Sequence, residues 1–174
     1  MRNGLFVLAV TCLALGACDS RRDSDVTSQL DPSQFVGSWD LVAYDRRDES
    51  GNVAEAYYGD DPLGHLIYTA SGDMSVHLVD PRIGSFESGD FLNGTPEEIK
   101  SAYEGYFGYF GTYSVDVEER TVTHHVIGAS FRGYTSSDMV RNFELSGDTL
   151  SLVSGVEIEG GVPSTFHLIW GRRE

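Results

Sequence analysis

Most of the chain after residue 34 alternates between apolar and polar positions, a pattern typical of β-strands that bury one face. In FVGSWDLVAYD, for example, Trp39, Leu41 and Ala43 would share one face. Turn signatures such as Ser-Gly-Asp separate the runs. The pattern predicts about eight strands, over residues 35–45, 64–70, 74–79, 111–117, 121–128, 139–145, 149–155 and 164–173. Hairpins of this kind indicate an antiparallel barrel or sandwich, and the alternation alone does not choose between them.

One segment breaks the alternation and predicts a short amphipathic helix. Thr95 and Glu98 can form a capping box, with Pro96 at the first helical position. Apolar residues then recur at helical spacing, at Ile99, Ala102, Tyr103 and Tyr106. The preceding residues, 82–94, form a glycine- and serine-rich loop, and a loop of that length is often a lid or a mobile rim.

The N-terminal residues have the features of a bacterial lipoprotein signal. Arg2 precedes an apolar run over 5–15 that is too short to span a bilayer, and LGAC, ending at Cys18, resembles a lipobox. We expect a signal peptide over 1–17, acyl chains such as palmitate on Cys18, and a flexible polar tether over 18–33. The barrel domain would then cover 34–174. The alternative is an ordinary signal peptide cut near Ala17, which would leave Cys18 a free thiol.

This interpretation places the protein in the bacterial cell envelope, lipid-anchored at the periplasmic face, and leaves open which membrane holds it. The formal net charge of −15 disfavours binding to nucleic acid or to an anionic lipid surface. Attachment to a membrane would therefore come from the lipid on Cys18. Cys12, the other cysteine, would leave with the signal peptide, so we expect neither a disulfide nor a cysteine zinc site.

Several stretches, in order, resemble the bacterial and fungal lipocalin-like domain family of calycins. They are FVGSWDLVAY (35–44) with its Gly-x-Trp, PLGHLIYTASGDMSVHLVDP (62–81), YFGYFGTYSVDVEERTVTHHVIGASF (106–131), VRNFELSGDTLSLVSG (140–155) and LIWGRR (168–173). The resemblance implies an all-β, antiparallel up-and-down barrel of about eight strands with one short helix and a central apolar cavity. It also implies that Trp39 seals one end under a basic residue, Arg172 or Arg173, of which we favour Arg172.

The adjacent residues His124 and His125 are candidates for chemistry. On a strand they point to opposite faces, so they cannot both ligate one metal ion. His124 shares its face with Val122 and Val126, which favours the interior for His124. The remaining histidines show no metal-binding spacing, and we expect no metal site.

Arg141 shares a face with Phe143 and Leu145, so it would point inward with them. A charge inside a barrel must be paired. It could bind a carboxylate of a ligand, pair with Glu157 or Glu55, or pack against Tyr113. Together with the aromatic-rich region over 103–113, this gives the predicted ligand-binding residues Arg141, His124, Tyr113, Tyr109 and Phe143.

The sequence thus favours an envelope lipoprotein that binds a small hydrophobic or amphipathic molecule. One alternative is an isomerase or cyclase of lipocalin fold, in which His124, Arg141 and Tyr113 would act on a hydrophobic substrate. Another is a structural barrel with a filled interior. No nucleophile motif or phosphate-binding loop is present, so we assign no catalytic residue, expect no cofactor and favour binding over catalysis.

Overall fold

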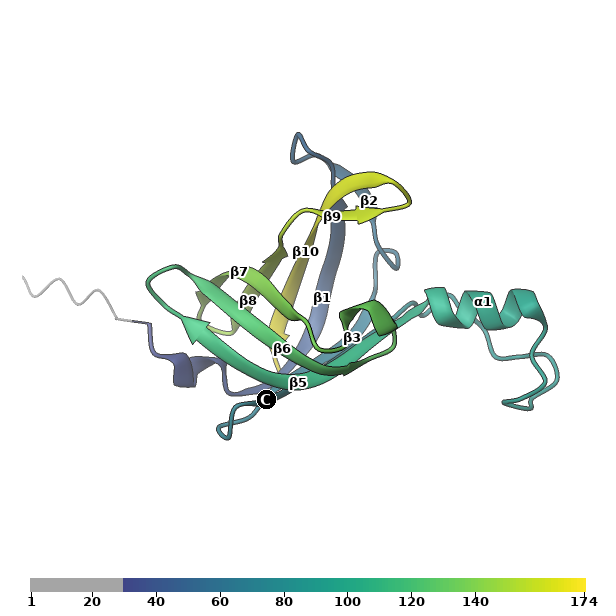
Figure 1. Cartoon of the computed structure of the whole chain (residues 1–174), viewed down its shortest axis with the longest axis horizontal. Helices are drawn as coiled ribbons and strands as arrows, with labels where there is room; N and C mark the ends of the chain where they lie inside the picture. Colours follow the sequence, from purple (N-terminus) through teal and green to yellow (C-terminus); the bar gives the residue numbers. More distant parts are fainter. Residues whose placement is uncertain (1–29) are drawn as a thin grey trace, which may run out of the picture.

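The computed structural model describes residues 30–174, and its centre is a closed antiparallel barrel (Figure 1). The signal peptide, Cys18 and most of the predicted tether lie outside the described residues. Eight long strands form the barrel: β1 (Gly37–Arg47), β3 (Leu63–Tyr68), β4 (Asp73–Val79), β5 (Tyr106–Asp116), β6 (Thr121–Ala129), β7 (Asp138–Ser146), β8 (Thr149–Ser154) and β10 (Val162–Arg172). The remaining elements are short: β2 (Val53–Ala56), β9 (Glu157–Glu159), α1 (Pro96–Glu104) and the 3-10 helices η1 (Pro32–Phe35) and η2 (Arg132–Tyr134).

The strand order makes the fold an up-and-down barrel. The order is β2-β1-β3-β4-β5-β6-β7-β8-β10-β9, and the additional pairing of β1 with β10 closes the sheet on itself. At Trp39, β1 pairs with Leu66 on one side and with Arg172 on the other. The predicted barrel is therefore confirmed, and the sandwich that the alternation alone left open is not formed.

A β-bulge in β1 changes which residues face the interior. The pairing of β1 with β10 shifts between Leu41 and Ala43, so that Val42 is exposed and Tyr44 is buried. We expected Ala43 to share the inner face with Trp39. That assignment is wrong, because the extra residue moves Tyr44 into the interior instead.

A second shift, in the pairing of β5 with β6, depends on a glycine. Phe110 pairs with Gly128 and Gly111 pairs with Val126, so Ile127 is the extra residue on β6. A Cβ on Gly111 would come within 2.0 Å of the carbonyl oxygen of His125. Only glycine allows this close approach of the two backbones.

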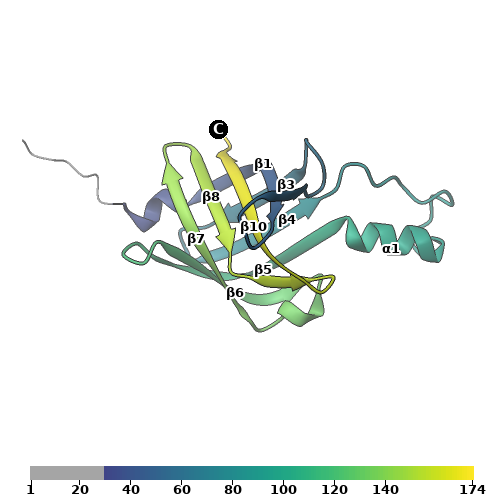
Figure 2. The same cartoon turned by 90° about the horizontal axis from the view of Figure 1, so that it is seen from above.

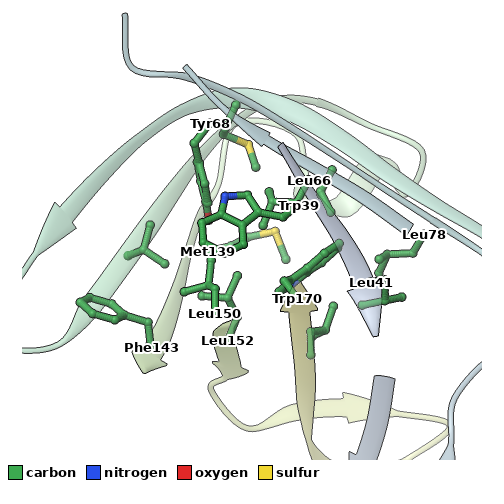
Figure 3. Packing of buried hydrophobic residues seen from close by; sticks show 14 of the residues in the cluster. Trp39, Leu41, Leu66, Tyr68, Leu78, Met139, Phe143, Leu150, Leu152 and Trp170 are labelled. Atoms are coloured by element: carbon green, nitrogen blue, oxygen red, sulfur yellow. The ribbon is translucent and has the colours of Figure 1, made fainter. Parts of the chain in front are cut away.

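The end of the barrel near the chain's N-terminal side is closed by aromatic packing (Figure 3). Trp39 is fully buried, and its Nε1 donates a hydrogen bond to the carbonyl of Phe35 at 2.9 Å. The guanidinium of Arg172 lies 4.0 Å from the centre of the Trp39 ring, the stacking that the resemblance implied, and donates to the carbonyl of Val36. Arg173 instead bonds Asp40 on the barrel exterior.

Helix η1 begins inside the segment that we expected to be tether. Asp31 and Gln34 form a capping box around it, and Phe35 is buried in the core, 4.8 Å from the ring of Phe143. Burial of the phenyl ring stabilises η1 against the barrel.

Residues 80–105, which we call the arm, connect β4 to β5 and project from the barrel (Figures 1 and 2). The predicted capping box of Thr95 and Glu98 is present at the start of α1. The helix ends at Glu104, with Gly105 as its C-cap, so Tyr106 begins β5 and does not belong to the helix. No residue of α1 is buried, so its apolar side does not pack on the barrel.

Within residues 30–174, no helix combines the length and the apolar character needed to cross a membrane.

Candidate functional site

A cavity of about 920 Å³ occupies the barrel. Its inner wall is largely apolar and includes Leu66, Val76, Leu152 and Leu168, all of which are buried. Its rim is formed by exposed residues from the arm, β5, the start of η2, β9 and β10. They are Tyr103, Tyr106, Phe131 (the N-cap of η2), Ile158 and Val162. The cavity is therefore open at the end opposite Trp39, and it is accessible from solvent.

His124 is at the centre of a buried polar cluster on the cavity wall. The hydroxyl of Tyr68, on β3, is 2.6 Å from its Nε2, and the hydroxyl of Tyr109, on β5, is 2.7 Å from its Nδ1. The imidazole is 1 % exposed. Strand pairing produces this arrangement, because β3, β4, β5 and β6 are neighbours and each contributes alternate side chains to the interior.

Burial sets the charge state of this cluster. Burial, together with the charges of Arg141 and His125, lowers the pKa of His124 from 6.5 to about 3. Burial also raises the pKa of Tyr68 and of Tyr109 above the ordinary tyrosine value, although the nearby charge of Arg141 opposes this. At neutral pH the cluster therefore consists of a neutral imidazole between two neutral phenols.

Arg141 points into the same cavity and forms an ion pair with a carboxylate. Its Nη1 is 3.5 Å from Oε1 of Glu157, and the hydroxyl of Tyr134 donates to Oε2 of Glu157 at 2.7 Å. The side chain of Arg141 is only 12 % exposed, so the ion pair removes the cost of an uncompensated charge. Of the alternatives open from the sequence, pairing with Glu157 is the one that the structure shows, whereas Glu55 pairs with Arg46.

Trp170 contributes an unsatisfied donor to the cavity wall. Its side chain is 1 % exposed, and its Nε1 has no hydrogen-bond partner among residues 30–174. A buried donor without a partner is costly, and this nitrogen has almost no accessible surface.

The structure brings together three of the five residues predicted to bind a ligand. Tyr109, His124 and Arg141 line the cavity. Tyr113 does not, because its ring packs behind Tyr68 at 4.5 Å and its hydroxyl donates to the backbone of Thr69. That Tyr109, His124 and Arg141 contact a ligand stays a prediction.

Phe143 is also absent from the cavity wall. It lies deeper in the barrel, at the closed end, where the ring of Phe35 packs edge-on against it. The sequence placed Phe143 on the inner face of β7 correctly, but it could not show that the ring of Phe35, from η1, would pack against Phe143 at the closed end.

His125 lies on the outer face of the barrel. Its Nδ1 is 2.7 Å from Asp138, and its Nε2 is 3.0 Å from the hydroxyl of Ser114. His124 and His125 thus belong to different environments. In the part of the chain that the structure describes, no group of three or more His, Cys, Asp or Glu side chains could hold a metal ion.

Two residues of the site were missed in the sequence. Tyr68 and Trp170 each lie on the inner face of a strand, next to Leu66 and Leu168 at alternate positions. Alternation alone could have placed both inside the barrel. Their polar roles were not visible, because His124 is 56 residues from Tyr68 in the chain and only the strand register brings them together.

Comparison with known proteins identifies the family to which the chain belongs. A family profile described as "Lipocalin-like domain" matches residues 36–173, which include the whole barrel. The 4'-hydroxy-3'-methoxypropiophenone carrier protein of Aspergillus oryzae is 29 % identical over 97 residues, which cover 48 % of this chain and 87 % of that protein. The crystal structure of a lipocalin-like protein from Bacteroides uniformis aligns with a TM-score of 0.42 and 16 % identity, over 80 % of this chain and 98 % of that one. Because the profile spans the barrel from β1 to β10, the chain belongs to the lipocalin-like domain family.

Proposed function

We propose that this barrel binds and carries a small, mainly hydrophobic molecule that has a polar group. The cavity of about 920 Å³ carries this proposal, because it is open at one end and lined by aliphatic and aromatic side chains around a few polar groups. Sites for small organic ligands have this size and composition. The cavity argues against a purely structural barrel, whose interior would be filled by its own side chains.

The similarity to a fungal carrier protein supports the same function. That relative is named as a carrier of 4'-hydroxy-3'-methoxypropiophenone, a phenolic aryl ketone. An aryl ketone of this kind would place its ring among the aromatic side chains of the cavity and its oxygens near the polar cluster. It is therefore the first ligand to test on this chain.

The cellular setting belongs to the same proposal. A lipid on Cys18 would hold the carrier in the bacterial envelope, at the periplasmic face of a membrane. The support is the sequence of the N-terminal residues, in which a positive charge, an apolar run and LGAC follow one another. Nucleic acid is an unsuitable partner, because the formal net charge of −15 would repel its phosphates.

A second candidate function is catalysis, and the cluster around His124 is the observation that favours it. A buried histidine between two tyrosines can move protons in an isomerase or a cyclase. An efficient general base, however, has a pKa near the working pH, and burial holds that of His124 at about 3. The cluster therefore suits hydrogen bonding to a ligand better than proton abstraction.

The test of the carrier function is a titration of the protein with 4'-hydroxy-3'-methoxypropiophenone, followed by calorimetry. We expect saturable binding, and we expect Leu152→Trp to abolish it, because Leu152 lines the cavity and the larger side chain would occupy it. Val140→Trp is the matched control, since Val140 is half-exposed on the outer face of the neighbouring strand β7. Circular dichroism shows whether each variant is folded.

Two results would count against the carrier function. One is the absence of binding by this ketone and by a panel of other hydrophobic molecules, with no ligand found by native mass spectrometry after gentle purification. The other is equal binding by folded Leu152→Trp and by the unchanged protein, because the ligand would then lie outside the barrel.

A further inference from the structure

The hydroxyl of Tyr68 can donate its hydrogen to one atom only. It lies 2.6 Å from Nε2 of His124, and Tyr68 is 1 % exposed and is not part of the cavity wall. Within residues 30–174 no second polar atom is paired with this hydroxyl. If Nε2 carried a hydrogen, the Tyr68 hydroxyl would accept that bond and its own hydrogen would be buried without a partner, which is unfavourable. The geometry therefore makes Nε2 the acceptor.

The direction of the next bond follows from the chemistry of the ring. A neutral imidazole has one acceptor nitrogen and one N–H donor, so Nδ1 of His124 carries the hydrogen and donates it to the oxygen of Tyr109, 2.7 Å away. The hydroxyl hydrogen of Tyr109 is then not used within the cluster. Arg141, which is close to this hydroxyl, cannot accept it, because a guanidinium has donors only.

Glu157, whose charge acts on Tyr109, forms no hydrogen bond with it among the described residues, and its oxygens contact other side chains. One is 3.5 Å from Arg141, and the other accepts the hydroxyl of Tyr134 at 2.7 Å. Tyr109 lines the cavity, so its free hydrogen is available to whatever the cavity contains. The chain of bonds from Tyr68 through His124 thus ends in one donor at the cavity wall.

Trp170 is a second buried donor beside the cavity. Its side chain forms part of the wall, and its Nε1, which has almost no accessible surface, has no acceptor among the described residues. The hydroxyl of Tyr109 is therefore the donor that the deep wall offers to a ligand. A ligand atom that only accepts hydrogen bonds, such as an oxygen, fits such a wall.

The charges around the cavity determine whether that oxygen is neutral or anionic. Among the described residues that line the cavity, each arginine is paired with a carboxylate that also lines it. The pairs are Arg46–Glu55 at 3.1 Å, Arg82–Asp80 at 2.7 Å and Arg141–Glu157 at 3.5 Å. Glu104, also at the rim, is paired with Lys100 at 3.6 Å. An anionic ligand would find no unpaired cation here, and burying its charge would be unfavourable.

From these observations we infer that the cavity selects a neutral molecule with a carbonyl oxygen, and that the hydroxyl of Tyr109 donates a hydrogen bond to that oxygen. The inference rests on the proposed function, since it names the class of ligand and the group that recognises it. His124 is a positioning residue: it holds the Tyr109 oxygen so that the hydroxyl hydrogen points away from the cluster. A hydrocarbon of the same shape would leave the donor unsatisfied.

Three matched probes test this selection: 2-acetylnaphthalene, 2-ethylnaphthalene and 2-naphthoate. They share one fluorescent ring system and differ in having a neutral acceptor, no acceptor and an anionic acceptor. We expect 2-acetylnaphthalene to bind roughly fivefold to tenfold more tightly than 2-ethylnaphthalene, the ratio expected for one hydrogen bond, and 2-naphthoate to bind most weakly.

The variants Tyr109→Phe and Tyr113→Phe separate the proposed donor from a general effect of losing a hydroxyl. Tyr109→Phe should reduce the ratio between the ketone and the hydrocarbon to about one. Tyr113→Phe should keep the ratio, because the hydroxyl of Tyr113 donates to the backbone carbonyl of Thr69 and its ring is not part of the cavity wall.

The tautomer of His124 can be measured without any ligand. Long-range proton–nitrogen NMR correlations of the imidazole should show Nδ1 protonated and Nε2 unprotonated in the folded protein. A ring protonated at Nε2 overturns the proposed direction of the hydrogen bonds from Tyr68 through His124 to Tyr109, whatever the binding data show.

The possible outcomes of the titrations distinguish this inference from the carrier function. If both neutral probes bind equally, or if Tyr109→Phe keeps the preference for the ketone, the inference is wrong and the carrier function stands. Tightest binding of 2-naphthoate also overturns the inference, because the site would then be one for anions. If no probe binds, both proposals lose their support.

Discussion

At the scale of single residues, the contrast between His124 and His125 shows how the face of a strand decides the chemistry of a side chain. Both belong to β6 and are adjacent in the chain. His124 is buried between Tyr68 and Tyr109, and its pKa falls to about 3. His125 is half-exposed and bonds Asp138 on the outside of the barrel. One peptide unit therefore separates a neutral hydrogen-bonding group of the interior from a group of the surface.

The buried imidazole should make stability depend on pH. Because the pKa of His124 is about 3 in the folded chain and 6.5 as the reference value, the unfolded chain binds an extra proton between these limits. The free energy of unfolding should therefore fall as the pH falls from 6.5 towards 3, by up to about 1.4 kcal/mol per pH unit from this group. Urea unfolding at a series of pH values measures this slope.

The control for that measurement compares two substitutions on the same strand. His124→Gln removes the titrating group while keeping a side chain that can form hydrogen bonds, so it should reduce the slope. His125→Gln changes the exposed neighbour and should leave the contribution of His124 in place. Equal slopes for the unchanged protein and for folded His124→Gln would show that another group causes the loss of stability in acid.

Much of the site could be predicted at this scale, and the limit has a physical reason. Alternation along β6 and β7 predicts that the side chains of His124 and Arg141 point inward, as they do. Alternation describes one strand at a time, however, and the partners of these residues depend on the register between strands. The contact of Tyr68 with His124, at 2.6 Å, exists only because the closed barrel brings their strands together. The same holds for the burial of the unpaired Nε1 of Trp170.

At the scale of secondary-structure elements, the sequence predicted the strands that bury a face and missed those that do not. All residues of β2 are exposed, so this strand has no alternation to recognise. The start of β5, YFGYFG over 106–111, mixes aromatic residues and glycines, and the strand begins at Tyr106 rather than at residue 111. The bulge in β1 also follows from the pairing with β10 and not from the residues of β1 alone.

The arm (residues 80–105) is an element whose removal the barrel should tolerate. The N–H of Asp80 donates to the carbonyl of Gly105 at 2.8 Å, and Val79 pairs with Tyr106, so the two ends of the arm already meet as a hairpin. We expect replacement of residues 83–103 by a short glycine-containing turn to leave the barrel folded, because Arg82 stays beside the buried carboxylate of Asp80. The free energy of unfolding should stay the same or rise by about 1–2 kcal/mol, because a shorter loop costs less entropy to close.

The same deletion should affect the exchange of ligand. Ile83 and Tyr103 of the arm line the rim of the cavity, so their loss would widen the opening. We expect ligand to associate and dissociate faster, which stopped-flow fluorescence can measure, while the deep polar cluster remains intact. A chain that fails to fold without the arm would contradict the view that α1, which buries no residue, contributes little to the barrel.

At the scale of the whole molecule, the two ends of the barrel have different roles. Trp39, Phe35 and Arg172 close the end at which the described chain begins, and residues of the arm line the rim of the cavity at the other end. Figure 1 shows η1 and the arm on opposite sides of the barrel. The described chain enters the barrel at the closed end, through η1, so this end and not the opening is the one joined to the N-terminal residues.

The proposed lipid anchor on Cys18 can be tested with the chain's own two cysteines. In a bacterial host supplied with labelled palmitate, the full chain should incorporate the label and fractionate with membranes, because LGAC supplies the cysteine to be acylated. Cys18→Ser should lose both properties, whereas Cys12→Ser, a change within the apolar run, should keep them. Equal labelling of Cys18→Ser and the unchanged chain would rule out Cys18 as the site, and loss of membrane attachment in Cys12→Ser alone would point to the apolar run as the anchor. Because the net charge is −15 and repels anionic lipid headgroups, no electrostatic attraction to such a surface should retain Cys18→Ser once the acyl chains are gone.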